Sequence, residues 1–222
     1  MYIELYRKPL RNHVKKITAL LFITVLICFT GCEDKKCDLP SENNTTDTIN
    51  NTCAIVDINR STLKTNKDAK KFKLNDIDNK NYTIYFDKKN ILIEDISQDF
   101  VLLNFFATWC PPCTGQVPYI ADLEKKYKDK LFVAGILVND ANKEYHELEA
   151  FSAKYHIDYF ISNAKQNDTF AVELLKGLSI KENFQLPLTI LYKNGKYYAH
   201  YEGGVPIEMI EYDITKAMEN KE

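Results

Sequence analysis

Two buried strands joined by a helix are predicted in the middle of the chain. Phe100–Ala107 and Leu131–Val138 are nearly continuous apolar runs, which are typical of strands covered on both faces. Between them, apolar residues recur at helical spacing, at Val117, Ile120, Ala121, Leu123 and Tyr127. A strand, a helix and a strand in this order favour a parallel pair joined by a right-handed crossover.

Further strands and helices are predicted on both sides of this unit, from about residue 71 onward. Before it, Tyr82–Phe86 and Ile91–Ile93 indicate two short strands around a turn. After it, the pattern predicts a helix at 142–156, a strand at 159–161, a helix at 169–178, paired strands at 188–192 and 196–201 and a helix at 206–218. Asn194 and Gly195, between the paired strands, are a strong signal for a tight hairpin. The predicted fold class is therefore α/β, with a central mixed sheet flanked by helices.

A different pattern occupies the N-terminus. Residues 1–31 contain five basic residues and one acid, and Ile17–Phe29 is apolar except for two threonines. This run of 13 residues is too short to span a bilayer comfortably, because a spanning helix needs roughly 20 residues. A basic start, a short apolar run and small residues after it are typical of an export signal. Residues 1–31 are therefore predicted to be a signal peptide outside the fold, with an uncleaved anchor or a buried helix as the alternatives.

The end of this segment resembles the signal of bacterial lipoproteins. It reads Phe29-Thr30-Gly31-Cys32, with Phe29 where those signals usually have Leu. The resemblance implies that Cys32 becomes the lipid-bearing first residue. The lipid would then hold a water-soluble domain on the periplasmic side of a bacterial membrane. Residues 32–69 are predicted to be a flexible tether, because their polar stretch has too few apolar side chains to order itself.

Composition and charge narrow the function classes. The 222 residues are 45% hydrophobic and 27% charged, as expected for one globular domain with additional terminal segments. Twenty-nine basic and 31 acidic residues give a formal net charge of -2. The chain therefore has no overall positive field to bind the phosphates of a nucleic acid, and no nucleic-acid partner is predicted.

The cysteines that precede the central unit have different predicted roles. Of the six in the chain, Cys28 leaves with the predicted signal and Cys32 takes the lipid. Cys37 and Cys53 enclose the polar stretch of the tether, in an exported compartment where disulfides persist. A structural disulfide between them is predicted, with two free thiols or an intermolecular link as the alternatives.

Two asparagines within the predicted tether are candidate glycosylation sites. Asn44 and Asn59 each have an acid two residues before and a hydroxyl residue two residues after. This arrangement resembles the extended acceptor sequence of bacterial N-glycosylation. Chance matches are the alternative, because the segment is rich in Asn and Thr.

The candidate chemistry lies in Trp109-Cys110-Pro111-Pro112-Cys113, between a predicted buried strand and a predicted helix. Unsatisfied N–H groups and the dipole of a helix N-terminus favour the thiolate of the first cysteine, which is the attacking species in thiol-disulfide exchange. Cys110 is therefore predicted to be the nucleophile, and Cys113, one turn inside the helix, the shielded resolving thiol. Pro111 and Pro112 remove two N–H donors and fix φ, so we expect them to tune the reduction potential.

Half a zinc site, a haem-attachment site and an inert disulfide are alternative interpretations of the two cysteines. Zinc needs two further ligands, but the four histidines are scattered, at His13, His146, His156 and His200. Covalent haem needs a histidine directly after the second cysteine, where this chain has Thr114. The strand before the motif and the helix after it favour redox chemistry over an inert bridge. No metal and no cofactor are predicted.

The segment Leu103–Cys113 resembles the active-site strand and turn of exported thioredoxin-like reductases of the TlpA and ResA type, which include the cytochrome c maturation thioredoxins. Pro118 matches the proline that kinks the first helix of that fold, and Leu186–Thr189 matches its cis-proline loop. The resemblance covers roughly residues 70–222 and implies a thioredoxin-like fold with an N-terminal strand extension and an inserted strand and helix. It also implies a substrate groove that includes Trp109, Pro111, Pro112, Leu186 and Pro187.

Two positions differ from related groups. Thioredoxin has a buried Asp where Asn104 stands, whereas relatives in the exported group share the Asn. Cytochrome-maturation members often carry a Glu between the cysteines or three residues after the second, where this chain has Pro111, Pro112 and Gln116. A carboxylate there would accept a proton from the buried thiol and raise the thiol pKa values. Its replacement weakens the assignment to haem maturation and leaves the assignment to oxidoreductases intact.

The predicted function is a membrane-tethered thiol-disulfide oxidoreductase that reduces disulfides in exported proteins. The resemblance implies apocytochrome c as a substrate and a membrane electron donor of the DsbD/CcdA type. A disulfide oxidase or isomerase is the alternative within the same chemistry, because reduction potential sets the direction. A non-catalytic module that presents the groove at Pro187 to peptides is the alternative from a different class.

Overall fold

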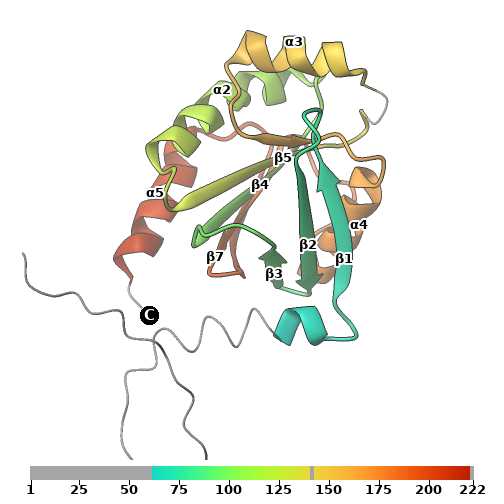
Figure 1. Cartoon of the computed structure of the whole chain (residues 1–222). Helices are drawn as coiled ribbons and strands as arrows, with labels where there is room; N and C mark the ends of the chain where they lie inside the picture. The colour runs from blue at the N-terminus through green and yellow to red at the C-terminus, as the bar shows by residue number, and fades with distance from the viewer. Residues whose placement is uncertain (1–61, 141–142, 221–222) are drawn as a thin grey trace, which may run out of the picture. The chain divides into compact units, whose positions relative to one another are not determined.

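The computed structural model describes residues 62–140 and 143–220 (Figure 1). Their elements are β1 (Lys70–Asn75), β2 (Asn81–Asp87), β3 (Asn90–Ile93), β4 (Phe100–Phe106), α2 (Pro111–Lys126), β5 (Leu131–Leu137), α3 (Tyr145–Tyr155), β6 (Phe160–Ser162), α4 (Asn167–Leu178), β7 (Leu188–Lys193), β8 (Lys196–Glu202) and α5 (Ile207–Glu219). The predicted signal peptide, Cys32, Cys37, Cys53, Asn44 and Asn59 lie outside the described residues. What the sequence predicts for these residues therefore stays a prediction.

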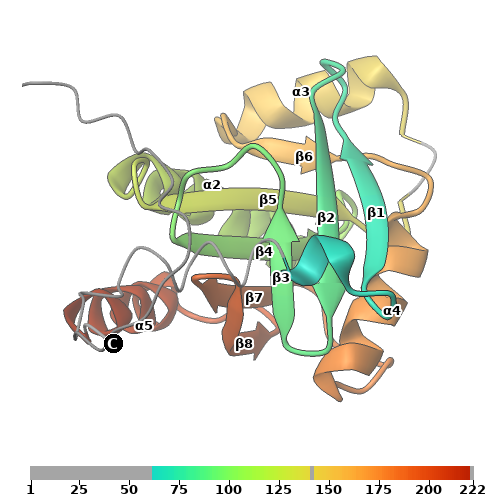
Figure 2. The same ribbon diagram turned by 60° about the horizontal axis from the view of Figure 1, so that its bottom comes forward.

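A single eight-stranded sheet forms the centre of the described chain, in the order β1-β2-β3-β8-β7-β4-β5-β6. Strand β4 pairs in parallel with β5, and β5 with β6, whereas the other neighbours are antiparallel. The predicted mixed sheet, the parallel pair around α2 and the β7–β8 hairpin are therefore confirmed. Helices α2, α3 and α5 cover one face of the sheet and α4 covers the other (Figures 1 and 2).

The two faces carry separate hydrophobic cores, and β4 contributes to both. Leu102 and Phe106 pack under α2 and α5, while Leu103 and Phe105 pack under α4. All seven residues of β4 are buried. The continuous apolar run in the sequence thus reflects a strand with a helix layer on each side, since alternate residues of a strand face opposite directions.

The β7–β8 hairpin is held against the N-terminal strands at its turn. Gly195 adopts a φ of +75°, a conformation open to glycine and costly for other residues. Its carbonyl oxygen accepts a hydrogen bond from Ile91 N at 2.7 Å. A Cβ on Gly195 would lie 2.6 Å from the carbonyl oxygen of Ile91. The turn glycine is therefore required both by the hairpin and by the close approach of β3, which pairs with β8 at Asn90 and Lys196.

None of the helices within 62–140 and 143–220 is long and apolar enough to cross a membrane. Residues 62–65, at the end of the segment predicted as a tether, form one helical turn. Nearby, Asn66 donates a side-chain hydrogen bond to Asp87 at 2.8 Å, and Lys64 forms an ion pair with Glu94 at 2.7 Å.

Gly135 in β5 occupies a position with no room for a side chain. A Cβ there would lie 2.9 Å from Cε1 of Phe106 and 3.1 Å from Cε2 of Tyr159, and both rings are buried. The substitution Gly135→Ala is expected to lower the free energy of unfolding by about 1–3 kcal/mol, because overpacking a close-packed core displaces its neighbours. Urea unfolding followed by circular dichroism measures the change.

Gly115 in α2 provides the matched control. A Cβ there would meet nothing within 4 Å, and the residue is exposed in the interior of a helix. Gly115→Ala is therefore expected to raise the free energy of unfolding by about 0.5–1 kcal/mol, the helix preference of alanine over glycine. If both substitutions shifted stability in the same direction, the packing argument for Gly135 would be wrong.

Candidate active site

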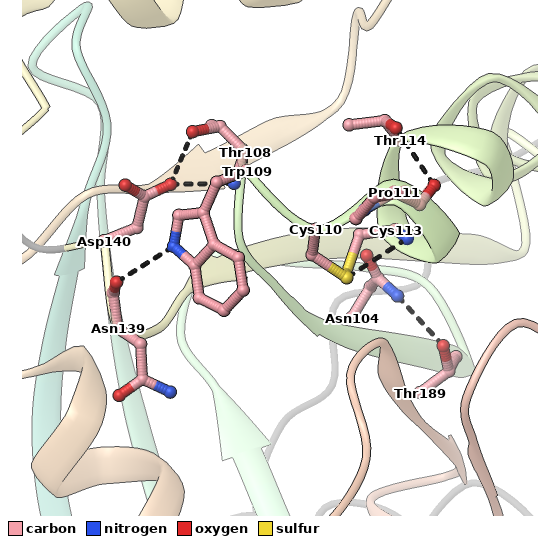
Figure 3. The surroundings of a disulfide bond; sticks show 10 residues. All are labelled: Asn104, Thr108, Trp109, Cys110, Pro111, Cys113, Thr114, Asn139, Asp140 and Thr189. Atoms are coloured by element: carbon pink, nitrogen blue, oxygen red, sulfur yellow. Dashed lines mark hydrogen bonds between the residues drawn. A yellow bond between two sulfur atoms is a disulfide. The ribbon is translucent and has the colours of Figure 1, made fainter.

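The two cysteines of the Cys-Pro-Pro-Cys motif are joined where β4 ends and α2 begins (Figure 3). The structure contains a disulfide between Cys110 and Cys113, with an S–S distance of 2.17 Å and a Cα–Cα distance of 5.2 Å. Cys110 is the N-cap residue of α2 and has an extended backbone, and Pro111 and Pro112 occupy the first two helical positions. Proline suits these positions because the first N–H groups of a helix have no partner within it.

The start of α2 directs a backbone donor at the first sulfur. Since Pro111 and Pro112 lack an N–H, the first N–H in the helix belongs to Cys113. It donates to Sγ of Cys110 at 3.3 Å. This donor and the positive end of the helix dipole both favour negative charge at that sulfur. The site can therefore stabilise a thiolate at Cys110 once the disulfide is reduced.

Burial distinguishes the two cysteines. Cys113 is completely buried, whereas Cys110 retains 5% of its surface at the edge of the domain. Both belong to the hydrophobic core under α2 and α5. Trp109, next to Cys110, is 62% exposed. An incoming molecule can thus reach Cys110 but not Cys113, which is the geometry expected of a nucleophile and a shielded partner.

The loop before the motif is fixed to the loop after β5. The carboxylate oxygen Oδ2 of Asp140 accepts hydrogen bonds from Thr108 N at 2.7 Å and Thr108 Oγ1 at 2.6 Å. One residue earlier, the carbonyl oxygen of Asn139 accepts from Nε1 of Trp109 at 3.2 Å. Asp140 was not among the residues predicted for the site, although the sequence contains a signal for it. The carboxyl ends of adjacent parallel strands meet at one edge of a sheet, and Asp140 closely follows the strand predicted to lie beside Phe100–Ala107.

The opposite wall of the site is built from the ends of β7 and β8. The Leu186–Pro187 peptide bond is cis, and the carbonyl of Pro187 accepts a hydrogen bond from Gly203 N at 2.9 Å. The next residue, Gly204, lies against Pro112: a Cβ on it would be 3.5 Å from Cβ of Pro112. The chain around 203–204 therefore connects the predicted groove residues at 186–187 with those at 109–112.

Buried neutral amides occur on both elements that adjoin the Cys-Pro-Pro-Cys motif, β4 and α2. Asn104 in β4 and Thr189 in β7 are drawn beside the disulfide in Figure 3, and Nδ2 of Asn104 donates to Oγ1 of Thr189 at 2.9 Å. Gln116, one turn after Cys113, is also buried and donates from Nε2 to the carbonyl of Val205 at 3.1 Å. The positions at which related groups carry carboxylates thus hold side chains that do not titrate.

Two tyrosines of the same core stay neutral phenols. Burial raises the pKa of Tyr159. Burial, followed by its hydrogen bond to Asp213, also raises the pKa of Tyr201. Among residues 62–140 and 143–220, no group of three or more His, Cys, Asp or Glu side chains is arranged to hold a metal ion. The pair of cysteines at the start of α2 can form and break the Cys110–Cys113 disulfide reversibly, and this is the chemistry that the arrangement supports.

Comparison with known proteins gives one family match and several relatives. The model of the Redoxin family matches residues 58–182. Thioredoxin-like protein YneN of Bacillus subtilis (strain 168) is 37% identical over 67 residues, which cover 30% of this chain and 39% of YneN. Thiol-disulfide oxidoreductase ResA of Oceanobacillus iheyensis is 29% identical over 129 residues, which cover 56% of this chain and 60% of that protein. The matches thus span less than two thirds of the length of either relative.

A solved structure of similar fold is the thiol:disulfide interchange protein of the thioredoxin family from Chlorobium tepidum TLS. It superposes with a TM-score of 0.51 at 19% identity, covering 67% of this chain and 94% of the other. At this identity the likeness concerns the fold alone. It confirms the predicted thioredoxin-like fold.

Proposed function

This chain belongs to the Redoxin family, and we propose that it is a thiol-disulfide oxidoreductase that reduces disulfides in exported proteins. The observation that carries the proposal is the pair of cysteines at the N-terminus of α2, with the second completely buried and the first receiving the Cys113 N–H. The similarity to a relative named thiol-disulfide oxidoreductase supports the same reaction.

The reaction follows from the different positions of the two sulfurs. In the reduced protein, the thiolate of Cys110 attacks one sulfur of a substrate disulfide. A mixed disulfide forms with Cys110, and the other substrate sulfur leaves as a thiolate and takes a proton. Cys113 then gives up its proton and attacks Sγ of Cys110, which releases the second substrate thiolate. The substrate gains two electrons and the protein is left with the disulfide seen in the structure.

The neighbouring residues position the substrate. We propose that an extended peptide crosses the site between Trp109 on one side and Leu186 and Pro187 on the other. The exposed indole of Trp109 and the exposed Pro111 and Pro112 offer it an apolar surface around the first sulfur. The cysteines are the catalytic residues in this proposal, and the other five are groove residues.

The proposal also covers the cellular location of the protein, its substrate protein and its electron donor. We propose that residues 70–222 work on the periplasmic side of a bacterial membrane, held by a lipid on Cys32 and the tether at 32–69. The support is the resemblance of residues 1–32 to a lipoprotein signal. Apocytochrome c as client and a membrane donor of the DsbD/CcdA type rest on the resemblance of the motif to cytochrome c maturation thioredoxins.

The direction of electron transfer and the enzymatic activity are tested together by a redox titration and an insulin-reduction assay. Trp109 is the only tryptophan and adjoins Cys110, so its fluorescence is expected to follow the redox state during equilibration with glutathione. A reductase is expected to have a potential near the roughly -270 mV of thioredoxin and to turn over insulin with dithiothreitol.

Other outcomes lead to the alternative functions. A potential near the roughly -120 mV of DsbA would make the protein an oxidase. A disulfide that does not exchange with glutathione at all would contradict the enzymatic proposal and leave a peptide-binding module.

A further inference from the structure

A buried amide oxygen beside the disulfide has no hydrogen-bond partner. Asn104 is 1% exposed, and its Nδ2 is used by Thr189. Its Oδ1 is buried and unpaired among the described residues. Buried polar atoms in native proteins are nearly always hydrogen-bonded, and an orphan destabilises the state in which it occurs. The unpaired oxygen of Asn104 therefore lowers the stability of the oxidised form of this protein.

The position of Asn104 in β4 places its side chain on the face that carries the cysteines. Side chains along a strand alternate between faces, so Asn104 lies on the same side as Leu102 and Phe106. Those two residues pack in the same core as Cys110 and Cys113. Figure 3 shows the amide of Asn104 among the surroundings of the disulfide. The group that changes chemically on reduction and the unpaired oxygen thus share one buried environment.

A second buried oxygen without a partner belongs to a residue close to Cys113 in the chain. Gln116 follows Cys113 by one helical turn, and its Oε1 is buried without a partner among the described residues. Its Nε2 is occupied by Val205 O, as Nδ2 of Asn104 is by Thr189. The strand before the motif and the helix after it thus each carry a buried acceptor without a partner, and the disulfide has no donor to offer.

We infer that Asn104 sets the redox preference of the site by accepting a hydrogen bond from the thiol of Cys113 in the reduced protein. This inference rests on the proposed function, because it concerns the dithiol form. Two electrons from a reductant such as glutathione break the S–S bond, and Cys113 takes up a proton. The new S–H is a donor, although a weak one, and it lies in the core that contains the unpaired Oδ1.

The consequence is a bias toward the reduced form. Oxidation removes the S–H and leaves Oδ1 without a partner, so the amide opposes disulfide formation and raises the reduction potential. An amide does not titrate, and its effect is therefore independent of pH around neutrality. A carboxylate at this place would accept the same hydrogen bond and would also exchange protons with the thiol. Asn104 thus acts as a positioning residue for the proton of Cys113.

If Asn104 has only a structural role, a different effect on the reduction potential is expected. In that case the amide only joins β4 to β7 through Thr189, with which it also pairs in the sheet register. Its removal would then destabilise both redox forms equally and leave the potential unchanged. The reduction potential therefore separates the two roles, and stability alone does not.

The test compares the double variant Asn104→Leu/Thr189→Val with the single variant Thr189→Val. The single variant removes the partner of Nδ2 and keeps Oδ1, so its potential is expected to match that of the wild type. The double variant replaces the pair by apolar side chains. Its equilibrium constant for reduction by glutathione is expected to fall about tenfold, which corresponds to a potential about 30 mV more negative. Equal potentials in the two variants would overturn the inference.

A second variant keeps the test decisive where the double variant does not fold. Asn104→Asp preserves the size of the side chain and introduces a titrating group. Its potential is expected to vary with pH with an additional break that the wild type lacks, since the introduced carboxyl would be coupled to the proton of Cys113. Identical pH profiles for this variant and the wild type would show that residue 104 is not coupled to the thiol.

The failure of this inference is distinguishable from failure of the proposed function. If the wild type does not exchange with glutathione, the proposed function is wrong, and the inference that rests on it falls as well. If the wild type exchanges and the variants show unchanged potentials and pH profiles, only the role of Asn104 is wrong.

Discussion

Replacing Cys110 by alanine is expected to abolish disulfide reduction, whereas replacing Cys113 by alanine is expected to leave the protein covalently joined to its substrates. Without Cys110, the remaining sulfur is completely buried and cannot reach a protein disulfide. Without Cys113, Cys110 still has its backbone donor at the helix N-terminus and still attacks. The mixed disulfide then persists, because no second thiol is in place to resolve it.

The measurement is a non-reducing gel of each variant after expression in its host, followed by mass spectrometry of the trapped proteins. Cys110→Ala/Cys113→Ala serves as the control for non-covalent association. Equal trapping by the two single variants would contradict the assigned roles. Recovery of apocytochrome c from the Cys113→Ala complexes would support the proposed client, and its absence among abundant exported clients would contradict it.

The central strands of the fold were predictable because local pattern and tertiary burial coincide in them. Every residue of β4 is buried, so the apolar run marks the strand from end to end. The turn at Asn194 and Gly195 carries its own conformational signal and forms the expected hairpin. Strand β1 gave no such signal: it lies at the edge of the sheet, and only Leu74 of its six residues is fully buried.

Helix ends were less predictable than helices. The helix predicted at 142–156 begins at Tyr145 in the structure, after the N-cap residue Glu144, whose backbone N–H donates to Oε2 of Glu147 at 3.0 Å. Glutamate is not among the preferred N-cap residues, which explains why the start was placed too early. The helix predicted from Thr169 begins at Asn167, where Asn167 donates from Nδ2 to the carbonyl of Leu137 in β5 at 3.0 Å. That contact depends on tertiary structure.

The candidate site also has a part that was predictable from the sequence and a part that was not. The two cysteines and their prolines form a local motif, so a strand followed by a helix was sufficient to identify them. The unpaired oxygen of Asn104 could not be predicted, because it depends on the pairing of Asn104 with Thr189 across β4 and β7. These residues are separated by 85 positions in the chain. Sequence alone gives the chemical type of each residue but not which polar atoms remain without a partner.

Removing the carboxylate of Asp140 is expected to loosen the loop that presents the first cysteine. The side chain of Asp140 is 7% exposed and accepts from both the backbone and the hydroxyl of Thr108. Each hydrogen bond to a charged group contributes roughly 1.5–3 kcal/mol, so Asp140→Ala is expected to lower the free energy of unfolding by about 3 kcal/mol. Urea unfolding of the oxidised protein measures this change.

The same substitution is expected to slow insulin reduction roughly tenfold to a hundredfold, because small displacements of a reacting group have large effects on rate. Thr108 is followed directly by Trp109 and Cys110, and the indole of Trp109 is fixed by the neighbouring carbonyl of Asn139. When Thr108 loses its acceptor, Cys110 is no longer held in one orientation to the incoming disulfide. The reduction potential is expected to change little, since the contacts of the sulfurs remain.

Two controls separate the hydrogen bonds from the charge of Asp140. Asp140→Asn keeps an oxygen in the same place and is expected to retain most of the stability and rate. Lys143→Ala removes the cation 4.0 Å from the carboxylate and is expected to have a small effect, because pairs near the surface contribute little. If Asp140→Ala matched the wild type in both stability and rate, the loop would be held by the indole contact alone. If Lys143→Ala were as damaging as Asp140→Ala, charge pairing would be the feature that positions Cys110.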